Sequence, residues 1–322
     1  MSFVLNGRPG VGAATRARIL DAARDLGWRP STRARALSNS RAFALGLVMS
    51  RSPELLAADP FFPHFVAGVE TVLAGRGYAL VLQVVGDDWR AEEDCYRRLA
   101  RDERVDGVFL TDLRRHDPRF DLLVELELPA VALAVVAGAR CPLPQVAVED
   151  RLGVEQAVEH LVELGHSRIA HVAGAPGYVH SASRRAAWRR ALRRAGLAPG
   201  PVVAADFSAA GGAAATKRLL SLPDPPTAIV YANDLMAIAG MGVALEAGLR
   251  VPAELSLVGF DDVPLAAHLT PPLTTVRQDA LAWGQAAART LLAVVEGQPL
   301  PAAQLDPPRL IVRGSTAPPR PR

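Results

Sequence analysis

Short apolar segments rich in β-branched residues alternate with amphipathic helical segments along most of the chain after residue 42. Several of these segments are apolar on both faces, as strands must be when helices cover each side of a sheet. Alternation of this kind gives parallel, doubly wound sheets, so the sequence predicts an α/β fold. The expected strands are residues 43–49, 78–85, 105–111, 129–136, 145–149, 168–174, 201–207, 227–233 and 255–260.

The expected strands are too many for one ordinary sheet of this type, and the 322-residue length exceeds the usual size of one domain. We therefore expect two lobes that divide near residues 147–149 and share a hinge made by late segments of the chain. Ligands of open α/β sheets bind beyond the carboxyl ends of the strands, which predicts a cleft between the lobes. The expected N-terminal lobe comprises residues 43–147 and 277–305, and the C-terminal lobe residues 148–276 and 306–322.

Positive charge is concentrated at the start of the chain. Residues 1–41 hold eight arginines against two aspartates, a net charge of +6, whereas the whole chain has a net charge of +3. The remainder is therefore mildly acidic. A short basic segment on a mildly acidic body is typical of a polyanion-binding module, although a solvated arginine-rich helix has the same composition.

The glycines of GRPGVG, residues 7–12, allow two interpretations. A dinucleotide-binding loop needs a preceding strand and GxGxxG spacing, whereas this segment has GxxGxG spacing and only six residues before it. The alternative is a helix, a loop and a second helix. Gly7 would end the first helix, and an apolar stripe containing Ile19, Leu20 and Leu26 predicts a second helix from Ala13. We favour the helical interpretation.

A series of motifs follows one order through the whole chain. The head contains SFVLNG, TRARILDAARDLGWRPS and ARAL, and the body contains DPFF, RVDGVFL, VEDRLG, HLVELGHSRIAHVAG, NDLMAIAG, LRVPAELSLVGFDD and LTPPLTTVRQD. Together they resemble the LacI/GalR family of bacterial transcription regulators. The resemblance implies two periplasmic-binding-protein-like lobes, preceded by a partial all-α helix-turn-helix head (residues 1–30) and a hinge helix or linker (residues 31–42).

The head departs from the family pattern at its start. The first helix, the tight turn and the beginning of the recognition helix have no counterpart before Met1. Either the start codon is assigned too far downstream or the protein is truncated. We favour the first explanation, because a head without its first helix would leave Val4 and Leu5 without packing partners.

The resemblance also implies how the head contacts operator DNA. In the family the recognition helix reads base edges in the major groove, and the hinge helices of two subunits pair in the minor groove. An apolar side chain there wedges between base steps, and Leu37 occupies the matching position. A core role for Phe3 and a simple arginine-bearing linker at 31–40 are the alternatives. The implied DNA contacts are Ser2, Phe3, Asn6, Arg33, Arg35 and Leu37.

The expected effector is a small sugar-like molecule bound between the lobes. Carbohydrates present hydroxyls at their edges and apolar C–H groups on their faces, so their sites combine charged or amide side chains with aromatic rings. Asp150, at the crossover between lobes, is expected to cap a helix instead. The expected effector contacts lie at strand ends or match family positions, and they are Phe61, Phe62, Glu149, Tyr178, His180, Arg184, Phe207, Asn233, Asp234 and Asp261.

Several of these residues also have an ordinary structural interpretation. Phe61 or Phe62 could belong to the core or to a dimer surface. Asp234 could cap the following helix, a common role for aspartate. Arg184 and Asp261 could pair with each other in a structural salt bridge.

Catalytic and metal-binding patterns are absent from the sequence. The seven histidines show no HxxxH or HExxH spacing, Cys95 and Cys141 form no CxxC pair, and no GxSxG motif occurs. We therefore expect reduced cysteines, no cofactor, no metal and no enzymatic activity. No apolar run is long enough to span a membrane and no signal segment is present, which predicts a soluble, cytoplasmic protein.

The sequence thus predicts a dimeric, sequence-specific transcriptional regulator, acting as a repressor, whose DNA binding is coupled to a sugar-like effector. Such coupling between two sites is typically worth about 1–3 kcal/mol. Two alternatives remain open. One is a cytosolic small-molecule sensor that has lost DNA binding through truncation of the head. The other is a carbohydrate-processing enzyme on a doubly wound fold.

Overall fold

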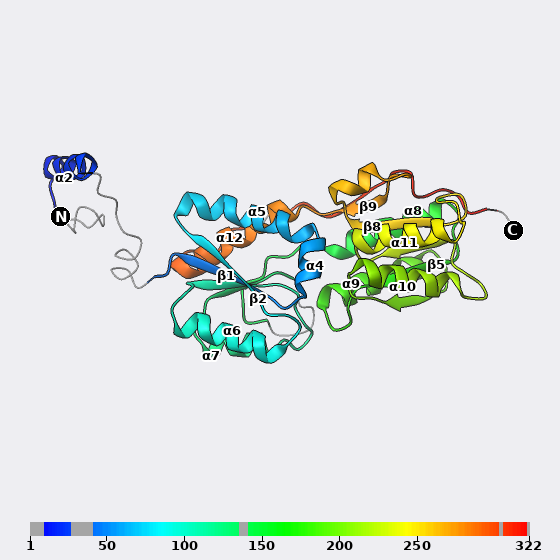
Figure 1. The fold of residues 1–322 in the computed structure, drawn as a ribbon, viewed down its shortest axis with the longest axis horizontal. Coiled ribbons are helices and arrows are strands. Elements are labelled where there is room, and N and C mark those ends of the chain that lie inside the picture. Colours follow the sequence, from blue (N-terminus) through cyan, green and yellow to red (C-terminus); the bar gives the residue numbers. More distant parts are fainter. Residues whose placement is uncertain (1–9, 27–40, 135–140, 303–304, 321–322) are drawn as a thin grey trace.

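The computed structural model describes residues 10–26, 41–134, 141–302 and 305–320. Two α/β lobes follow one another along the long axis of the molecule (Figure 1). Each lobe has a central sheet with helices on both faces, the doubly wound architecture expected from the alternation of apolar strands and amphipathic helices.

The N-terminal lobe contains a parallel sheet with the strand order β2–β1–β3–β4. Alternate residues of β1 enter two cores, since Leu45 and Leu47 pack under α5 and α12 while Val48 packs against α6 and α7. The strands are β1 (Ala44–Met49), β2 (Ala79–Val84), β3 (Gly107–Leu110) and β4 (Ala130–Ala132). The helices are α4 (Pro53–Ala58), α5 (Phe61–Leu73), η1 (Ala74–Arg76), α6 (Trp89–Arg101), α7 (Arg119–Glu125) and α12 (Ala280–Glu296).

The C-terminal lobe contains a sheet with the strand order β10–β9–β8–β7–β5–β6, parallel except for β10. Helices α8 and α9 pack on one face, and α10 and α11 on the other. The strands are β5 (Ile169–Ala173), β6 (Val202–Ala204), β7 (Ala228–Tyr231), β8 (Ser256–Asp261), β9 (Thr274–Arg277) and β10 (Arg309–Ile311). The helices are α8 (Asp150–Glu163), α9 (Val179–Arg194), α10 (Ala209–Leu220), α11 (Asp234–Glu246) and η2 (Pro264–His268).

The chain crosses between the lobes after β4, after β9 and after α12. The second crossing returns α12 to the N-terminal lobe, where it packs tightly on α5. A Cβ atom on Gly68 would overlap the carbonyl oxygen of Leu281, and one on Gly284 would overlap that of Phe65. These two glycines therefore allow the two helix backbones to approach each other. The close packing holds α12 in the N-terminal lobe, whereas β9, which precedes it in the chain, lies in the C-terminal lobe.

The segment 145–149 differs from the prediction because it does not form a strand. Within it, Gln145 forms an isolated β-bridge with Ala132. Pro142 and Pro144 lie just before it and have no N–H group to donate to a neighbouring strand. The apolar run there instead leads into the first crossing between the lobes.

Of the head, the structure describes residues 10–26. Helix α2 (Ala13–Asp25) occupies the segment where the apolar stripe predicts a helix. Most of its described side chains are exposed, Leu20 among them, and so is Leu26, which follows the helix. None of the helices in the described ranges is both long enough and apolar enough to cross a membrane. The predicted hinge helix and the predicted DNA contacts lie outside the described residues, namely Ser2, Phe3, Asn6, Arg33, Arg35 and Leu37.

Candidate ligand-binding site

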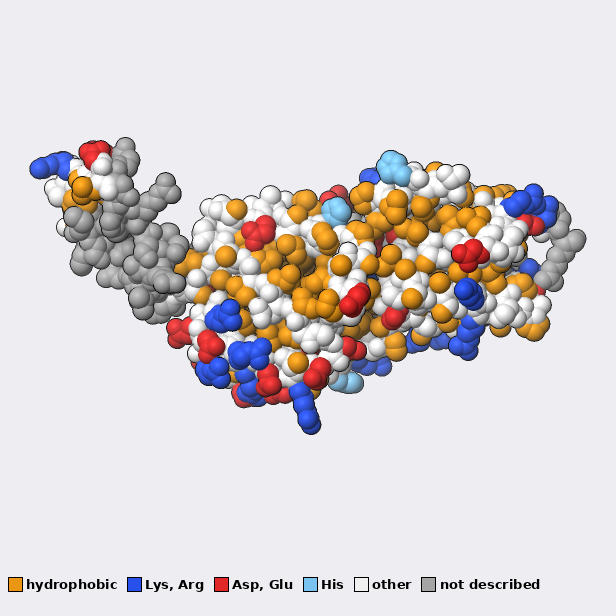
Figure 2. Space-filling view, in the orientation of Figure 1, with side chains coloured by type: hydrophobic (Ala, Val, Ile, Leu, Met, Phe, Trp, Pro, Cys, Tyr) orange, Lys and Arg blue, Asp and Glu red, His pale blue; other side chains and the backbone are white. Residues whose placement is uncertain are grey.

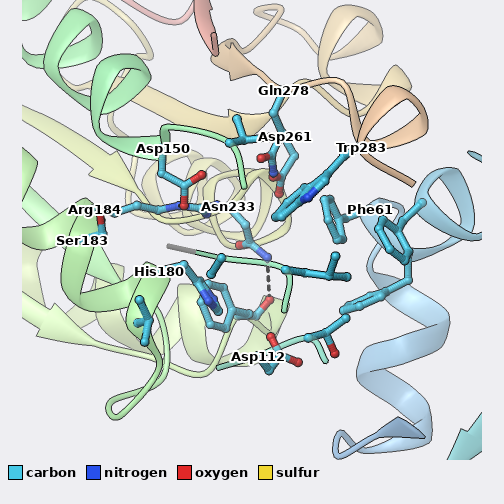
Figure 3. A pocket seen from close by; sticks show the side chains of 18 of the residues that line it. Phe61, Asp112, Asp150, His180, Ser183, Arg184, Asn233, Asp261, Gln278 and Trp283 are labelled. Atoms are coloured by element: carbon cyan, nitrogen blue, oxygen red, sulfur yellow. Dashed lines mark hydrogen bonds and ion pairs between the residues drawn. The ribbon is translucent and has the colours of Figure 1, made fainter. Parts of the chain in front are cut away.

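A cavity of about 290 Å³ lies where the carboxyl ends of the strands of the two lobes face each other (Figure 3). This is the location that the switch-point rule predicts for open α/β sheets. The residues that follow strand ends and line the cavity are Arg51 after β1, Thr111 and Asp112 after β3, Leu133 after β4, Asn233 after β7, Asp261 at the end of β8 and Gln278 after β9.

Aromatic rings form the wall on the side of the N-terminal lobe. Phe61 and Phe65 on α5 and Trp283 on α12 contact one another, with ring centroids 5.7 Å apart for Phe61 and Trp283 and 6.2 Å apart for Phe61 and Phe65. The indole Nε1 of Trp283 donates a hydrogen bond of 2.9 Å to the carbonyl oxygen of Val146. The ring orientation is therefore fixed, and the wall presents an apolar surface at a defined angle.

An arginine held by two carboxylates lies next to this wall. The guanidinium of Arg51 donates two hydrogen bonds of 2.6 Å to Asp112, and its Nη1 lies 3.5 Å from Asp59. Burial by itself would raise the pKa of Asp112, but the charge and hydrogen bonds of Arg51 outweigh it, so the pKa is below its ordinary value. For Asp59 burial outweighs the attraction to Arg51, and the pKa is raised.

A second arginine is anchored in the C-terminal lobe. Arg184 on α9 donates a hydrogen bond of 3.0 Å from Nε to Asp150 and one of 2.6 Å from Nη1 to the carbonyl oxygen of Ala232. Its guanidinium carbon lies 3.7 Å from the ring centroid of Phe260. The acidic partner of Arg184 is therefore Asp150 and not Asp261. The expectation that Asp150 caps a helix is wrong, since it is the first residue of α8 and its carboxylate faces Arg184.

Asp261 and Gln278 form the polar end of the cavity. Gln278 Nε2 donates a hydrogen bond of 2.6 Å to Asp261 Oδ1. Burial raises the pKa of Asp261 well above its ordinary value, although the positive charge of Arg184 opposes this. The other amide atom, Gln278 Oε1, is buried and accepts no hydrogen bond from the described residues. This end of the cavity therefore has unused hydrogen-bonding capacity.

Asn233 and His180 complete the wall on the side of the C-terminal lobe. Asn233 caps α11 by accepting a hydrogen bond from the Met236 N–H, and its Nδ2 donates to the carbonyl oxygen of Phe207 at 3.0 Å. The ring of His180 lies 5.2 Å from that of Phe207, between centroids. Burial, and secondly the charge of Arg184, lower the pKa of His180 to about 4, so the imidazole is neutral near pH 7.

Backbone strain accompanies three of the lining residues. Asp112, Phe207 and Asp261 have φ angles of +50°, +69° and +117°, a region that residues with a Cβ rarely occupy. Each lies at or just after the carboxyl end of a strand or in the loop that follows it. Strained backbone of this kind is concentrated in functional sites, where it directs side chains that a relaxed chain would place elsewhere.

Two of the predicted effector contacts do not line this cavity. The ring of Tyr178 stacks on His180 behind the wall, with centroids 5.5 Å apart. Asp234 is fully buried, where it accepts hydrogen bonds from Thr275 Oγ1 and from the Val263 N–H at 2.9 Å. Burial raises the pKa of Asp234 to about 7. Helix capping, the alternative role for Asp234, is also not observed, because the cap of α11 is Asn233.

The other predicted contacts do line the cavity, namely Phe61, Phe62, Glu149, His180, Arg184, Phe207, Asn233 and Asp261. Sequence reasoning did not find Arg51, Asp112 or Gln278, although each follows a strand end and the same rule would have selected it. Trp283 carries no such signal, because its position depends on the return of α12 to the N-terminal lobe.

Comparison with known proteins identifies the family to which this chain belongs. A periplasmic binding protein-like domain matches residues 158–316. The HTH-type transcriptional regulator CelR of Thermobifida fusca is 34% identical over 317 residues, which cover 97% of this chain and 91% of that protein. The HTH-type transcriptional repressor CytR of Escherichia coli is 32% identical, over 95% of this chain and 89% of that protein.

Two similar solved structures are also of transcriptional regulators. A CelR–cellobiose complex is 34% identical and superimposes with a TM-score of 0.79, covering 98% of this chain and 94% of that one. The lac repressor dimer bound to operator and the anti-inducer ONPF is 30% identical, with a TM-score of 0.83 and the same coverage. With its two lobes, its cavity at the strand ends and similarity over almost its whole length, this chain belongs to the LacI family of HTH-type transcriptional regulators.

Proposed function

We propose that this regulator is a homodimeric repressor that binds operator DNA through its N-terminal head and takes a small sugar between its lobes as effector. The observation that carries the effector assignment is the composition of the cavity wall. Aromatic rings from α5 and α12 lie beside a polar end formed by Asp261 and Gln278 in the same cavity. A sugar ring has the matching surfaces, an apolar face and a rim of hydroxyl groups.

The polar end has the capacity that a hydroxyl group would use. Gln278 Oε1 is a buried acceptor without a donor among the described residues, and a buried polar group left unpaired costs about 1–3 kcal/mol. Reorientation of the Gln278 side chain would bring this oxygen to the cavity, where a sugar hydroxyl would supply the missing donor. The volume of about 290 Å³ is close to the lower limit of about 300–1,000 Å³ for small-molecule pockets, which favours a small ligand. The relative CelR has been solved with cellobiose, a sugar.

Both lobes contribute to the wall, so a bound ligand favours one arrangement of the lobes over others. A ligand shifts a conformational equilibrium by its difference in affinity for the two states. We propose that this shift is transmitted to the head. In the described part of the head, α2 exposes Arg16 and Arg18, which suits contacts with DNA phosphates. Acting on DNA, the protein would work in the cytoplasm.

The relatives are regulators and not enzymes. We therefore assign the cavity a binding role and no catalytic one. No reaction step is required for an effector to act, since differential affinity for two lobe arrangements is sufficient.

Calorimetric titration of the full chain with a panel of mono- and disaccharides tests the effector assignment. We expect saturable binding of at least one sugar, at least tenfold weaker in Arg184→Gln and unchanged in Arg218→Gln, an exposed arginine on α10. Absence of binding across the panel, or equal affinity in both variants, would contradict the assignment.

Selection of genomic DNA fragments by the full chain tests the regulatory assignment separately. We expect the same short sequence to be enriched in repeated selections, and the identified sugar to change the amount retained. Enrichment that is random, or identical with and without the sugar, would show that the effector site does not control DNA binding.

A further inference from the structure

Helix α9 presents a row of arginines to solvent. Arg185, Arg189 and Arg193 are spaced by four residues and therefore lie on the same face of the helix, and all three are exposed. In the part of the chain that the structure describes, none of the three has an acidic partner. Like charges four residues apart destabilise a helix, so the row is unfavourable unless an anion offsets it.

The acidic residues closest to the row are already paired. Glu155 on α8 forms ion pairs with Arg190, whose Nη2 lies 2.7 Å from Oε1, and with Arg194, whose Nη2 lies 2.9 Å from Oε2. Arg194 also lies 3.1 Å from Glu159. The carboxylates of α8 therefore neutralise the arginines at the edge of the row and leave its centre positive.

The row faces a groove of about 630 Å³ that also includes a residue of the other lobe. Arg115, in the segment between β3 and α7, is exposed and contributes to the groove from the N-terminal lobe. Among the described residues, no acidic side chain lines it. The lining residues are Arg115, Arg185, Arg189, Arg190, Arg193 and Arg194, together with the small residues Ala182 and Ala186.

Two arginines of helix α6, by contrast, have acidic partners. Arg97 pairs with Glu93 and Glu125, and Arg101 pairs with Asp102. Side chains of both signs accordingly gather over α6 and α7 in Figure 2. Single exposed arginines without an acidic partner occur elsewhere in the described chain, for example Arg218 on α10, but on α9 three of them lie in one row and line one groove.

We propose that this groove is a second binding site, separate from the cavity between the strand ends, for a compact anion that carries several phosphoryl groups. Guanidinium groups bind phosphoryl oxygens through paired, charge-assisted hydrogen bonds, and several converge here from one helix and one facing loop. A concave groove of this size suits a compact anion better than a long double helix. The proposal does not depend on the identity of the sugar effector.

The groove spans the junction of the two lobes. Near Arg115 the Val179 N–H donates a hydrogen bond of 2.8 Å to the carbonyl oxygen of Leu113, and Arg114 forms an isolated bridge with Tyr178. An anion that contacts both Arg115 and α9 holds the lobes together on this side. Its binding therefore changes the equilibrium between lobe arrangements without occupying the cavity.

Calorimetric titration of the full chain with sodium tripolyphosphate, at constant ionic strength, tests the site. We expect saturable binding to the wild type and to the control Arg218→Gln, whose arginine is also exposed and without an acidic partner in the described chain. Binding should be at least tenfold weaker in Arg189→Gln, and at least threefold weaker in Arg115→Gln. Because these side chains are exposed, the variants should unfold at the wild-type temperature.

Three outcomes would overturn the proposal. Non-saturable binding, or equal affinity in Arg189→Gln and Arg218→Gln, would show that tripolyphosphate binds nonspecifically. Wild-type affinity in Arg115→Gln would show that the anion does not bridge the lobes. Loss of binding to a duplex of unrelated sequence in Arg189→Gln, without tripolyphosphate binding to the wild type, would identify the groove as a nucleic-acid surface.

Discussion

The two lobes contribute different chemistry to the cavity between them. The charges of the N-terminal lobe are satisfied internally, because Arg51 is bound by Asp112 and Asp59 and lies beside the aromatic wall. Beyond the ends of β8 and β9 hydrogen-bonding capacity is unused, since Gln278 Oε1 is buried and has no donor among the described residues. The difference indicates that the first lobe supplies a shaped apolar surface and that the second determines which polar groups of a ligand are accepted.

The largest effect is expected when the buried ion-pair cluster of Arg51, Asp59 and Asp112 is broken. Arg51→Met leaves two buried carboxylates without their cation, and we expect the free energy of unfolding to fall by about 3–5 kcal/mol. Urea denaturation measures this. The control is Arg76→Met, which breaks the ion pair with Glu296, where the arginine side chain is 49% exposed, and should cost about 0–1 kcal/mol. Similar losses in the two variants would show that the cluster is not a buried structural unit.

The next effect concerns pH and the C-terminal lobe. The pKa of Asp234 is raised from 3.8 to about 7 by burial, so the folded state retains a proton that the unfolded state loses. This contribution to stability is complete below about pH 4 and decreases as pH rises through 7. Between pH 5 and pH 8 it amounts to about 2–3 kcal/mol.

Thermal unfolding across this range measures the contribution. The decrease in Tm from pH 5 to pH 8 should be smaller in Asp234→Asn than in the wild type, while the exposed control Asp121→Asn should follow the wild type. If Asp234→Asn shows the full wild-type decrease, the aspartate is not the titrating group.

A smaller effect is expected from a substitution that displaces the ring of Phe207, which lines the cavity. A Cβ atom on Gly174 would overlap the Phe207 ring, so Gly174→Ala should displace the ring and cost about 1–3 kcal/mol of stability. It should also weaken sugar binding. Gly242→Ala is the matched control, because its added methyl meets no atom within 4 Å in the middle of α11 and should stabilise the protein by about 0.5–1 kcal/mol. Equal stability in the two variants would mean that Phe207 is not held against Gly174.

The smallest effect is expected on sugar affinity, from a substitution at the polar end of the cavity. Gln278→Leu removes the unpaired acceptor, and we expect sugar affinity to fall by about 1 kcal/mol, or roughly fivefold. Calorimetry measures this, with the exposed Gln298→Leu as control. Wild-type affinity in Gln278→Leu would place the polar contacts of the ligand elsewhere in the cavity.

The fold was largely predictable because strands covered on both sides have continuously apolar sequences, as β1 and β8 do. The site residues that lie at or just after strand ends were predictable from the sequence. Adjacent residues at a strand end point in different directions, so Asn233 reaches the cavity while Asp234 enters the core. Trp283 could not be predicted, because its place depends on the close contact of α5 with α12 at Gly68 and Gly284, which strand and helix periodicity do not encode.

The return of α12 across the cleft has a consequence for the gene. A frameshift or premature stop codon before residue 280 would spare every strand of the first lobe, yet it would strip away the helix that covers Leu45 and Leu47. Neither half of the protein is therefore encoded by one uninterrupted stretch, and cutting the reading frame between them would yield no independently stable fragment.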